Sequence, residues 1–248
     1  MKSHQPRPTI LLAVLLLLPS AAAYALHWVI FRNAHDIFFY LLMDVAFLFV
    51  QAVLATLVFD RLLNAHERQA VMKKLNVVVG IFFSQVGTPL LRLLSAFDGR
   101  AEDARKHLKA DGGWNPQHFA KMQSVLQSHE PAIEASRGDL ALLKVTLEQQ
   151  RDFMVRLLEN PNLLEHETLT ELLWAVFHLA DEFAHRPSVA SLPEPDRRHL
   201  ETDIRRAYDL LVREWLRHMQ HLKSDYPYLF SLAVRTNPFD PDAKVEVS

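Results

Sequence analysis

Two long apolar runs near the N-terminus dominate the hydrophobic pattern of the chain. They extend over residues 9–31 and 37–59, and the polar-leaning residues 32–36 separate them. An α-helix rises 1.5 Å per residue, so each run of about 23 residues spans roughly 34 Å as a helix. The hydrocarbon core of a bilayer is about 30 Å thick. The pattern therefore predicts a transmembrane helical hairpin within residues 1–60.

The first apolar run also has features of a secretory signal peptide. Basic residues lie within positions 1–7, an apolar segment covers 10–18, and Ala23-Tyr24-Ala25 resembles a cleavage site. The apolar character nevertheless continues beyond this site to Phe31, further than a cleaved peptide requires. We therefore favour a retained helix, and cleavage after Ala25 is the alternative.

The distribution of basic residues predicts the orientation of the hairpin. The turn between the runs has one basic residue, Arg32, which Asp36 offsets, whereas the second run is followed by Arg61, Arg68, Lys73 and Lys74. Because positively charged loops stay on the cytoplasmic side, the chain after residue 60 is expected in the cytoplasm. The expected location is the bacterial inner (cytoplasmic) membrane, with the bilayer as the first partner.

Two polar residues within the apolar runs need an explanation. Asp44 lies about 10 Å into the second run, where a carboxylate costs a few kcal/mol unless it has a partner. His27 lies at a similar depth in the first run and could face Asp44 across the hairpin. The favoured interpretation is a pair that fixes the packing of the hairpin, or a carboxylate that extends toward the lipid headgroups. A pH- or ion-responsive membrane switch is the alternative.

Beyond the apolar runs, the hydrophobic positions follow a helical period. A stripe at intervals of three and four residues predicts a helix in the core of a bundle, close to the membrane; it consists of Leu75, Val79, Phe82, Val86, Leu90, Leu93 and Phe97. We expect Gly80, Gly87 and Pro89 to bend this helix.

Turn residues divide the rest of the chain into further helices. They predict a loop at 111–116, followed by a helix that ends at 128 and by a second helix that Asp139 caps and that ends at 159. A third helix is expected over 163–185. After a linker at 188–195, a fourth helix is expected from its cap at Asp196 to residue 223. The tail from Pro227 is expected to wrap or fray. The pattern has no strand-like alternation. It therefore predicts an all-α fold with a helical bundle over residues 61–236 and a C-terminal tail at 237–248.

Composition removes several classes of function. The 248 residues include no cysteine, so disulfides and thiolate metal sites are absent. The six glycines fit no phosphate-binding loop, and no nucleophile elbow occurs. The net charge of −2 gives no reason to expect nucleic acid as a partner. We assign no catalytic residue and expect no cofactor in the favoured interpretation.

Histidine is the unusual residue, with 13 copies in the chain. Glu182 and His185 form an E-x-x-H pair, the spacing by which helical bundles present ligands to iron. The predicted helix that ends at residue 223 adds three further N and O ligands, Glu214, His218 and His221. The alternative cofactor is therefore iron, manganese or zinc. The helical period, however, directs His178 toward solvent and His218 toward the core, and no second E-x-x-H follows. Solvated faces with one hydrogen-bonded core histidine are therefore favoured.

Four segments resemble a family of uncharacterised prokaryotic membrane proteins with two spans. They are HDIFFYLLMD (35–44), KLNVVVGIFFSQVGT (74–88), LLWAVFHL (172–179) and YPYLFSLA (226–233). The resemblance implies a cytoplasmic all-helical domain and brings no known activity.

We therefore expect an integral inner-membrane protein that acts as a non-enzymatic signalling, scaffolding or assembly module. We further expect a homo-oligomer formed through residues 75–97 or the hairpin, with a membrane or cytoplasmic protein as a further partner. The alternatives are the metal-binding bundle and the pH- or ion-responsive switch described above.

Overall fold

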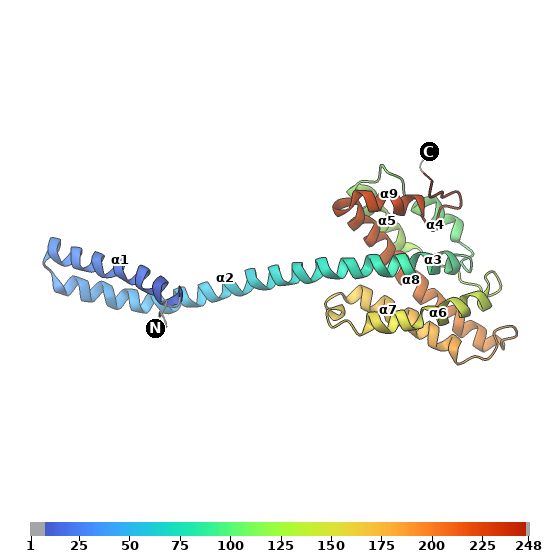
Figure 1. The fold of residues 1–248 in the computed structure, drawn as a ribbon, viewed down its shortest axis with the longest axis horizontal. Helices are drawn as coiled ribbons and strands as arrows, with labels where there is room; N and C mark the ends of the chain where they lie inside the picture. The colour runs from blue at the N-terminus through green and yellow to red at the C-terminus, as the bar shows by residue number, and fades with distance from the viewer. Residues whose placement is uncertain (1–7, 247–248) are drawn as a thin grey trace, which may run out of the picture. The chain divides into compact units, whose positions relative to one another are not determined.

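The described part of the chain, residues 8–246 of the computed structural model, is helical without a named strand (Figure 1). This confirms the predicted all-α class. The elements are α1 (Pro8–Phe31), α2 (Ala34–Phe82), the π-helical turn η1 (Phe83–Gly87), α3 (Thr88–Ser95), α4 (Ala101–Leu108), α5 (Pro116–Ser128), α6 (Leu140–Leu158), the 3₁₀ turn η2 (Leu163–Glu165), α7 (Glu167–Ala184), α8 (Glu194–Asp225) and α9 (Pro227–Arg235). The chain divides into two compact units, Met1–His66 and Glu67–Ser248, which we describe separately.

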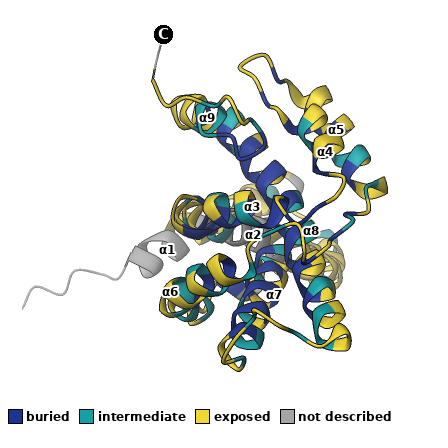
Figure 2. Cartoon of the chain, turned by 90° about the vertical axis from the view of Figure 1, so that its right-hand side faces the viewer, coloured by how far each residue is buried: buried dark blue, intermediate teal, exposed yellow. Residues whose placement is uncertain are grey.

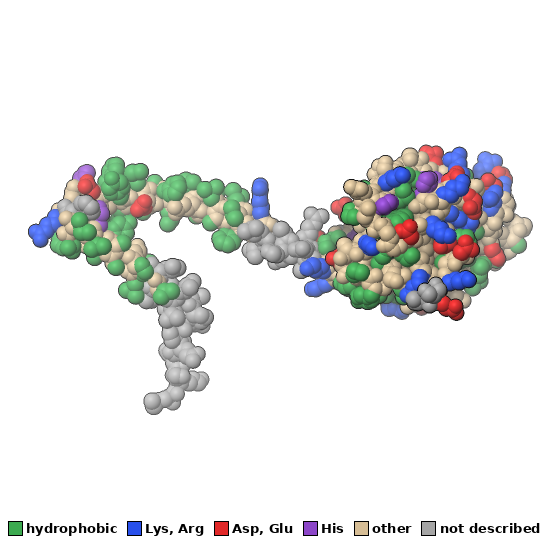
Figure 3. Space-filling model, turned by 90° about the horizontal axis from the view of Figure 1, so that it is seen from above, with side chains coloured by type: hydrophobic (Ala, Val, Ile, Leu, Met, Phe, Trp, Pro, Cys, Tyr) green, Lys and Arg blue, Asp and Glu red, His purple; other side chains and the backbone are tan. Residues whose placement is uncertain are grey.

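The N-terminal unit consists of α1, a turn and the first part of α2. Arg32 adopts a positive φ of 48° in the turn, and the side chain of Asn33 accepts a hydrogen bond from the His35 amide at 3.1 Å. The apolar side chains of residues 38–59 are exposed, as Figure 3 shows for this unit. The basic residues of the first seven positions and the side chain of Arg68 lie outside the described residues.

Two segments of the described chain are long and apolar enough to cross a bilayer. They are His35–Phe59, none of which is buried, and Val71–Ser95, of which 44% is buried. A shorter apolar helix covers Leu17–Ile30. The burial of the second segment reflects its place in the core of the C-terminal unit. The apolar side chains of 35–59 are therefore not buried by other residues of the described chain, in contrast to those of 71–95.

The C-terminal unit is built around α8. This helix packs against α7, α5, α9 and α3, and α7 also packs against α6. The buried faces of α7 and α8 meet in the centre of the unit (Figure 2). The stripe predicted from residue 75 onward lies in the same core, since Leu75, Val79, Phe82, Val86, Leu90 and Phe97 are each at most 3% exposed. The prediction of a core helix is thereby confirmed for these six residues, which belong to α2, η1, α3 and, for Phe97, the turn after α3. The seventh predicted residue, Leu93, is only partly buried.

A π-helical turn, η1, interrupts the helix where the bend was expected, and the bend itself stays a prediction. The amide of Thr88 donates to the carbonyl of Phe83, five residues earlier, which is the π-helical register. Pro89 follows η1 directly, and because it has no amide hydrogen it cannot donate to a carbonyl of the preceding turn. A Cβ atom at Gly87 would come within 2.5 Å of Cδ1 of Phe83, so only glycine leaves room for this ring. The glycine and the proline thus act at the turn itself.

Of the two predicted helix caps, the structure confirms one and contradicts the other, and it adds a third at Asn115. Asp139 accepts a hydrogen bond from the Leu142 amide at 2.9 Å and caps α6, as predicted. Asn115 caps α5, and Pro116 occupies its first turn. The prediction that Asp196 caps the next helix is wrong, because α8 begins at Glu194 after Pro193. Asp196 lies inside the first turn and binds Arg186 instead.

The C-terminal segment is more ordered than the sequence suggested. The expectation of a tail from Pro227 is wrong up to Arg235, because α9 covers these residues. Asn237 and Phe239 are buried, and the side-chain amide of Asn237 donates to the carbonyl of Leu108 at 2.9 Å. The ring of Phe239 contacts Trp215 edge to face. The segment therefore wraps onto the core at these positions.

Candidate metal centre

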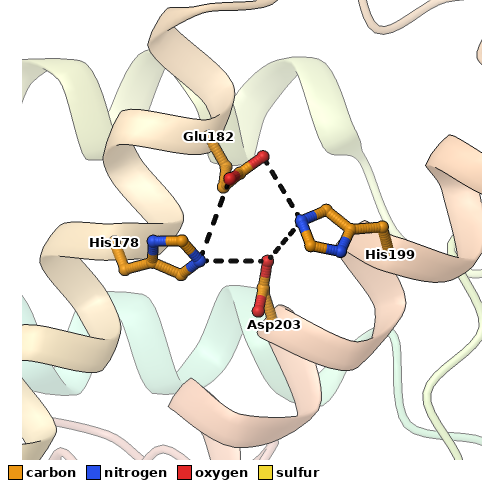
Figure 4. A group of neighbouring side chains, drawn as sticks. All are labelled: His178, Glu182, His199 and Asp203. Atoms are coloured by element: carbon orange, nitrogen blue, oxygen red, sulfur yellow. Dashed lines mark ion pairs between the residues drawn. The ribbon is translucent and has the colours of Figure 1, made fainter.

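Two pairs of side chains on α7 and α8 form a cluster of potential metal ligands. His178 and Glu182 lie one turn apart on α7, and His199 and Asp203 lie one turn apart on α8. Residues four positions apart share a helix face. Glu182 faces His199 and His178 faces Asp203, so the two helices run antiparallel here and the four side chains converge (Figure 4).

The four ligand atoms are close enough to share one ion. All of them lie within 4.8 Å of one another. His178 Nε2 is 3.5 Å from Asp203 Oδ2 and 3.8 Å from Glu182 Oε1. His199 Nε2 is 3.3 Å from Asp203 Oδ2 and 3.5 Å from Glu182 Oε2. Tetrahedral ligands about 2.1 Å from a zinc ion lie roughly 3.4 Å apart, so the cluster has nearly the right dimensions.

Burial within the cluster is uneven. The carboxylate of Asp203 is 4% exposed, whereas the imidazoles of His178 and His199 are about half exposed. Oδ2 of Asp203 points toward the centre of the cluster (Figure 4). It makes no hydrogen bond of good geometry within the described chain, and its polar neighbours are the Nε2 atoms of His199 and His178 at 3.3 Å and 3.5 Å. A buried carboxylate oxygen without a hydrogen bond is costly unless a cation faces it. An ion among the four ligands would satisfy this oxygen and would be accessible to solvent on the histidine side.

Arginines hold both carboxylates from outside the cluster. Arg186 donates from Nη1 to Oε2 of Glu182 at 2.7 Å, and this bond is the main reason that the pKa of Glu182 lies below its ordinary value. Arg206 donates from Nη1 to Oδ1 of Asp203 at 3.4 Å, which leaves Oδ2 for the centre. Such outer hydrogen bonds orient metal ligands. Two carboxylates and two neutral imidazoles would balance the charge of a divalent cation.

Only one of the ligands predicted from the sequence, Glu182, belongs to this cluster. His185 instead turns its Nδ1 toward the carbonyl of Asp181 at 2.8 Å. Glu214 accepts hydrogen bonds from Thr168 at 3.0 Å and from Arg217 at 2.7 Å.

The two remaining predicted ligands lie near each other on α8. His218 is buried and stacks on Phe83, which confirms a core histidine, but its Nδ1 makes no hydrogen bond, so the expected hydrogen bond is not found at this atom. His221 pairs with Asp225 at 2.7 Å. Neither belongs to the group of converging ligand atoms found among the described residues.

Sequence reasoning missed His199 and Asp203. The expectation that His178 faces solvent is only half right, because its ring is half exposed and its Nε2 still reaches Asp203. The signal that could have revealed the site is a repeat, since His-x-x-x-Glu on one helix is followed by His-x-x-x-Asp on the next.

In the N-terminal unit, Asp44 has a hydrogen-bond partner that the sequence analysis did not name, Tyr24. The Tyr24 hydroxyl donates to Oδ2 of Asp44 at 3.3 Å. Tyr24 lies one turn before His27 on α1, so both side chains are at a similar level of the helix. Tyr24 was not among the residues predicted for this pair. The proposed link between His27 and Asp44 stays a prediction.

The fold and the site define a class: an all-α protein with a helical C-terminal unit that carries a cluster of two histidines and two carboxylates. Comparison with known sequences is consistent with the two units. Residues 71–235 match a family described as "Uncharacterized protein MJ1433, C-terminal helical domain", and residues 2–63 match "MJ1433, N-terminal helical domain". The chain belongs to the MJ1433 family.

One relative covers almost the whole chain. Uncharacterized protein MJ1433 of Methanocaldococcus jannaschii is 40% identical over 237 residues, which is 96% of this chain and 95% of the relative. No solved structure matches the chain. The family therefore supports the all-helical architecture and leaves the activity to be inferred from the site.

Proposed function

We propose that this protein is a membrane-anchored metal-binding protein whose C-terminal unit holds a divalent transition-metal ion between α7 and α8. The observation that carries the proposal is the convergence of His178, Glu182, His199 and Asp203 within 4.8 Å, with an unsatisfied buried oxygen of Asp203 at its centre. Mixed imidazole and carboxylate ligands suit zinc, manganese and iron(II). We assign no catalytic residue.

Anchoring in the membrane is supported by the surface of the N-terminal unit. The segment 35–59 is 25 residues long, apolar and uncovered, and such a surface is unfavourable in water. Helix α1 would form the other span of the hairpin. The basic residues after the second run support a cytoplasmic C-terminal unit under the positive-inside rule. The proposed location is the cytoplasmic membrane, with the bilayer as partner.

Metal analysis of the purified full chain tests the proposed centre. After a mild chelator wash in detergent, we expect close to one equivalent of zinc, manganese or iron by mass spectrometry. His199→Ala and Asp203→Asn should lose the metal because each removes a ligand. His185→Ala and His221→Ala are matched controls that should retain it, because both histidines lie outside the centre. Metal loss in the controls, with retention in His199→Ala, would instead support the ligands predicted from the sequence.

The absence of cysteine allows a clean test of anchoring and orientation. His35→Cys places a thiol at an exposed position in the first turn of α2, and Glu148→Cys places one at an exposed position of α6. In intact cells, a membrane-impermeant maleimide should label the first variant and should label the second only after permeabilisation. The wild-type chain, which has no thiol, gives the background. Release of the protein by alkaline carbonate, or the reverse labelling pattern, would contradict this arrangement.

The homo-oligomer and the scaffolding role stay predictions. The stripe expected to join two copies is buried inside the C-terminal unit, so its side chains already have partners within the chain. An oligomer would therefore be formed through the hairpin. Size determination by light scattering in detergent measures it directly.

A further inference from the structure

A second feature of the C-terminal unit lies away from the proposed metal centre. An apolar groove of about 500 Å³ opens between the end of α2, η1, α8 and α9. Its floor is formed by Trp215, Met219 and Leu222 of α8, which are buried. Its walls include exposed apolar side chains, such as Ile81 of α2 and Leu232 of α9. Pockets of this size and lining accept small organic ligands.

One buried polar atom in the wall of the groove has no hydrogen bond. His218 is 9% exposed, and its Nδ1 has no hydrogen-bond partner. Its ring is fixed by stacking on Phe83, with centroids 5.0 Å apart and an interplanar angle of 9°. A Cβ atom at Gly80 would lie 3.7 Å from Cε1 of His218, so the ring is confined on this side as well. Buried polar atoms are normally satisfied, so a fixed and unsatisfied nitrogen indicates a missing partner.

The backbone of Phe83, the residue on which His218 stacks, has an irregular helical geometry. Phe83, Ser84 and Gln85 belong to the π-helical turn η1 and line the groove. Single π-helical turns within helices are frequent at binding sites. Gly87 permits this turn because Phe83 occupies the space that a Cβ atom would take. The stacking partner of His218 is therefore held by the irregular turn.

The charge of the lining narrows the class of ligand. None of the described residues that line the groove is a lysine, arginine, aspartate or glutamate. Burial lowers the pKa of His218 to about 4, and the nearby His221 adds to this effect, so the imidazole is neutral at pH 7. A neutral imidazole has one donor and one acceptor nitrogen. A ligand with a charged group inside the groove would lose its hydration without gaining a counter-charge.

We infer that the groove binds an uncharged, largely apolar small molecule that carries a carbonyl or hydroxyl group, and that this group hydrogen-bonds to His218. The apolar body of the ligand would cover Trp215, Met219 and Leu222. The binding site requires neither the metal ion nor its ligands. It is thus a second site, beyond the proposed metal-binding function.

Photolabelling of the full chain in detergent tests this inference. Benzophenone is an uncharged aromatic ketone that inserts into nearby C–H bonds on illumination, and 4-benzoylbenzoate is the same ketone with a carboxylate. We expect benzophenone to label the peptide that contains Met219 in a saturable manner, as located by mass spectrometry. The carboxylate analogue should label this peptide at least fivefold less.

Variants in the groove separate a specific site from general partitioning into micelles. Gly80→Leu extends a side chain into the groove and should reduce labelling of the Met219 peptide at least fivefold. Ala120→Leu is the matched control, since it adds the same group to an exposed position on α5 outside the groove. His218→Phe keeps a ring for stacking on Phe83 and removes the nitrogen. It should raise the half-saturating concentration of benzophenone about threefold to tenfold, the effect of one hydrogen bond.

Two results would overturn the inference. One is equal labelling of the Met219 peptide by benzophenone and its carboxylate analogue. The other is unchanged labelling in Gly80→Leu when circular dichroism shows the fold of the wild type. If Gly80→Leu does not fold, Ile81→Trp fills the groove from an exposed position, and the same comparison applies.

Discussion

Arg186 binds Asp196 across the connection between α7 and α8. Its Nε donates to Oδ2 of Asp196 at 3.1 Å, and Nη2 donates to Oδ1 at 2.5 Å. The remaining Nη1 donates to Glu182 at 2.7 Å. These bonds hold the pKa values of both carboxyl groups below their ordinary range. One guanidinium therefore joins the start of α8 to a proposed metal ligand on α7.

The first prediction concerns this arginine. Arg186→Gln should weaken zinc binding about tenfold or more, because Glu182 loses the group that orients it and keeps it ionised. Isothermal titration of the metal-free protein measures the affinity. Arg198→Gln is the control, since Arg198 pairs with exposed Glu194 and is not one of the converging groups. Equal affinities in the two variants would show that Arg186 does not support the centre.

The second prediction is a dependence of stability on pH that arises from His218. The pKa of this group is about 4 in the folded protein and 6.5 as its ordinary value. Between these values the unfolded chain binds the proton more strongly than the folded one. Protonation therefore favours unfolding, and the free energy of unfolding falls as the pH drops from about 6.5 toward 4. Well above pH 6.5, His218 is neutral in both the folded and the unfolded chain and does not change the free energy of unfolding.

Comparison with His218→Phe isolates this contribution. Lowering the pH from 7.5 to 5.5 should destabilise the wild type by about 1 kcal/mol more than the variant, since one pKa unit corresponds to about 1.4 kcal/mol. Urea unfolding at the two pH values measures the difference. Parallel losses of stability in both proteins would mean that His218 titrates normally in the fold.

The third prediction compares two glycines. A Cβ atom at Gly138 would lie 2.5 Å from ring carbons of Phe97, which is buried in the core. Gly138→Ala should therefore lower the free energy of unfolding by about 1–3 kcal/mol through overpacking. A Cβ atom at Gly112 would meet no other atom within 4 Å, and the residue has no positive φ, so Gly112→Ala should leave stability unchanged or slightly raised. Chemical denaturation of both variants provides the test.

Burial periodicity explains why the helices were predictable. Leu75 and Val79 face the core because positions three and four apart share a helix face, and their burial follows directly from the sequence. The cap at Asp139 was equally local, since its side chain bonds an amide three residues ahead. At Asp196 the local rule failed because the carboxylate is engaged by Arg186, a residue of the preceding connection.

The metal centre depends on information that one helix does not contain. His178 and Glu182 share a face of α7, but their partners are determined by the register at which α8 packs against α7. Two of the ligands predicted on α8 lie about four turns further along the helix than the observed ones, since Glu214 and His218 each follow His199 and Asp203, respectively, by 15 residues. The alignment of two helices is a property of the whole core, so the spacing within each helix could not reveal it.

The fourth prediction tests the role of the residues at the end of α2 in the core. Val79 is 3% exposed, and Val79→Asp would bury a carboxylate among apolar side chains, so it should lower the free energy of unfolding by at least about 3 kcal/mol. Val77, two residues earlier on the same helix, is 57% exposed. Val77→Asp should change stability by no more than about 0.5 kcal/mol, because its carboxylate remains hydrated. Urea unfolding of the two variants gives the comparison, and similar stabilities would show that the stripe is not part of the core that holds α8.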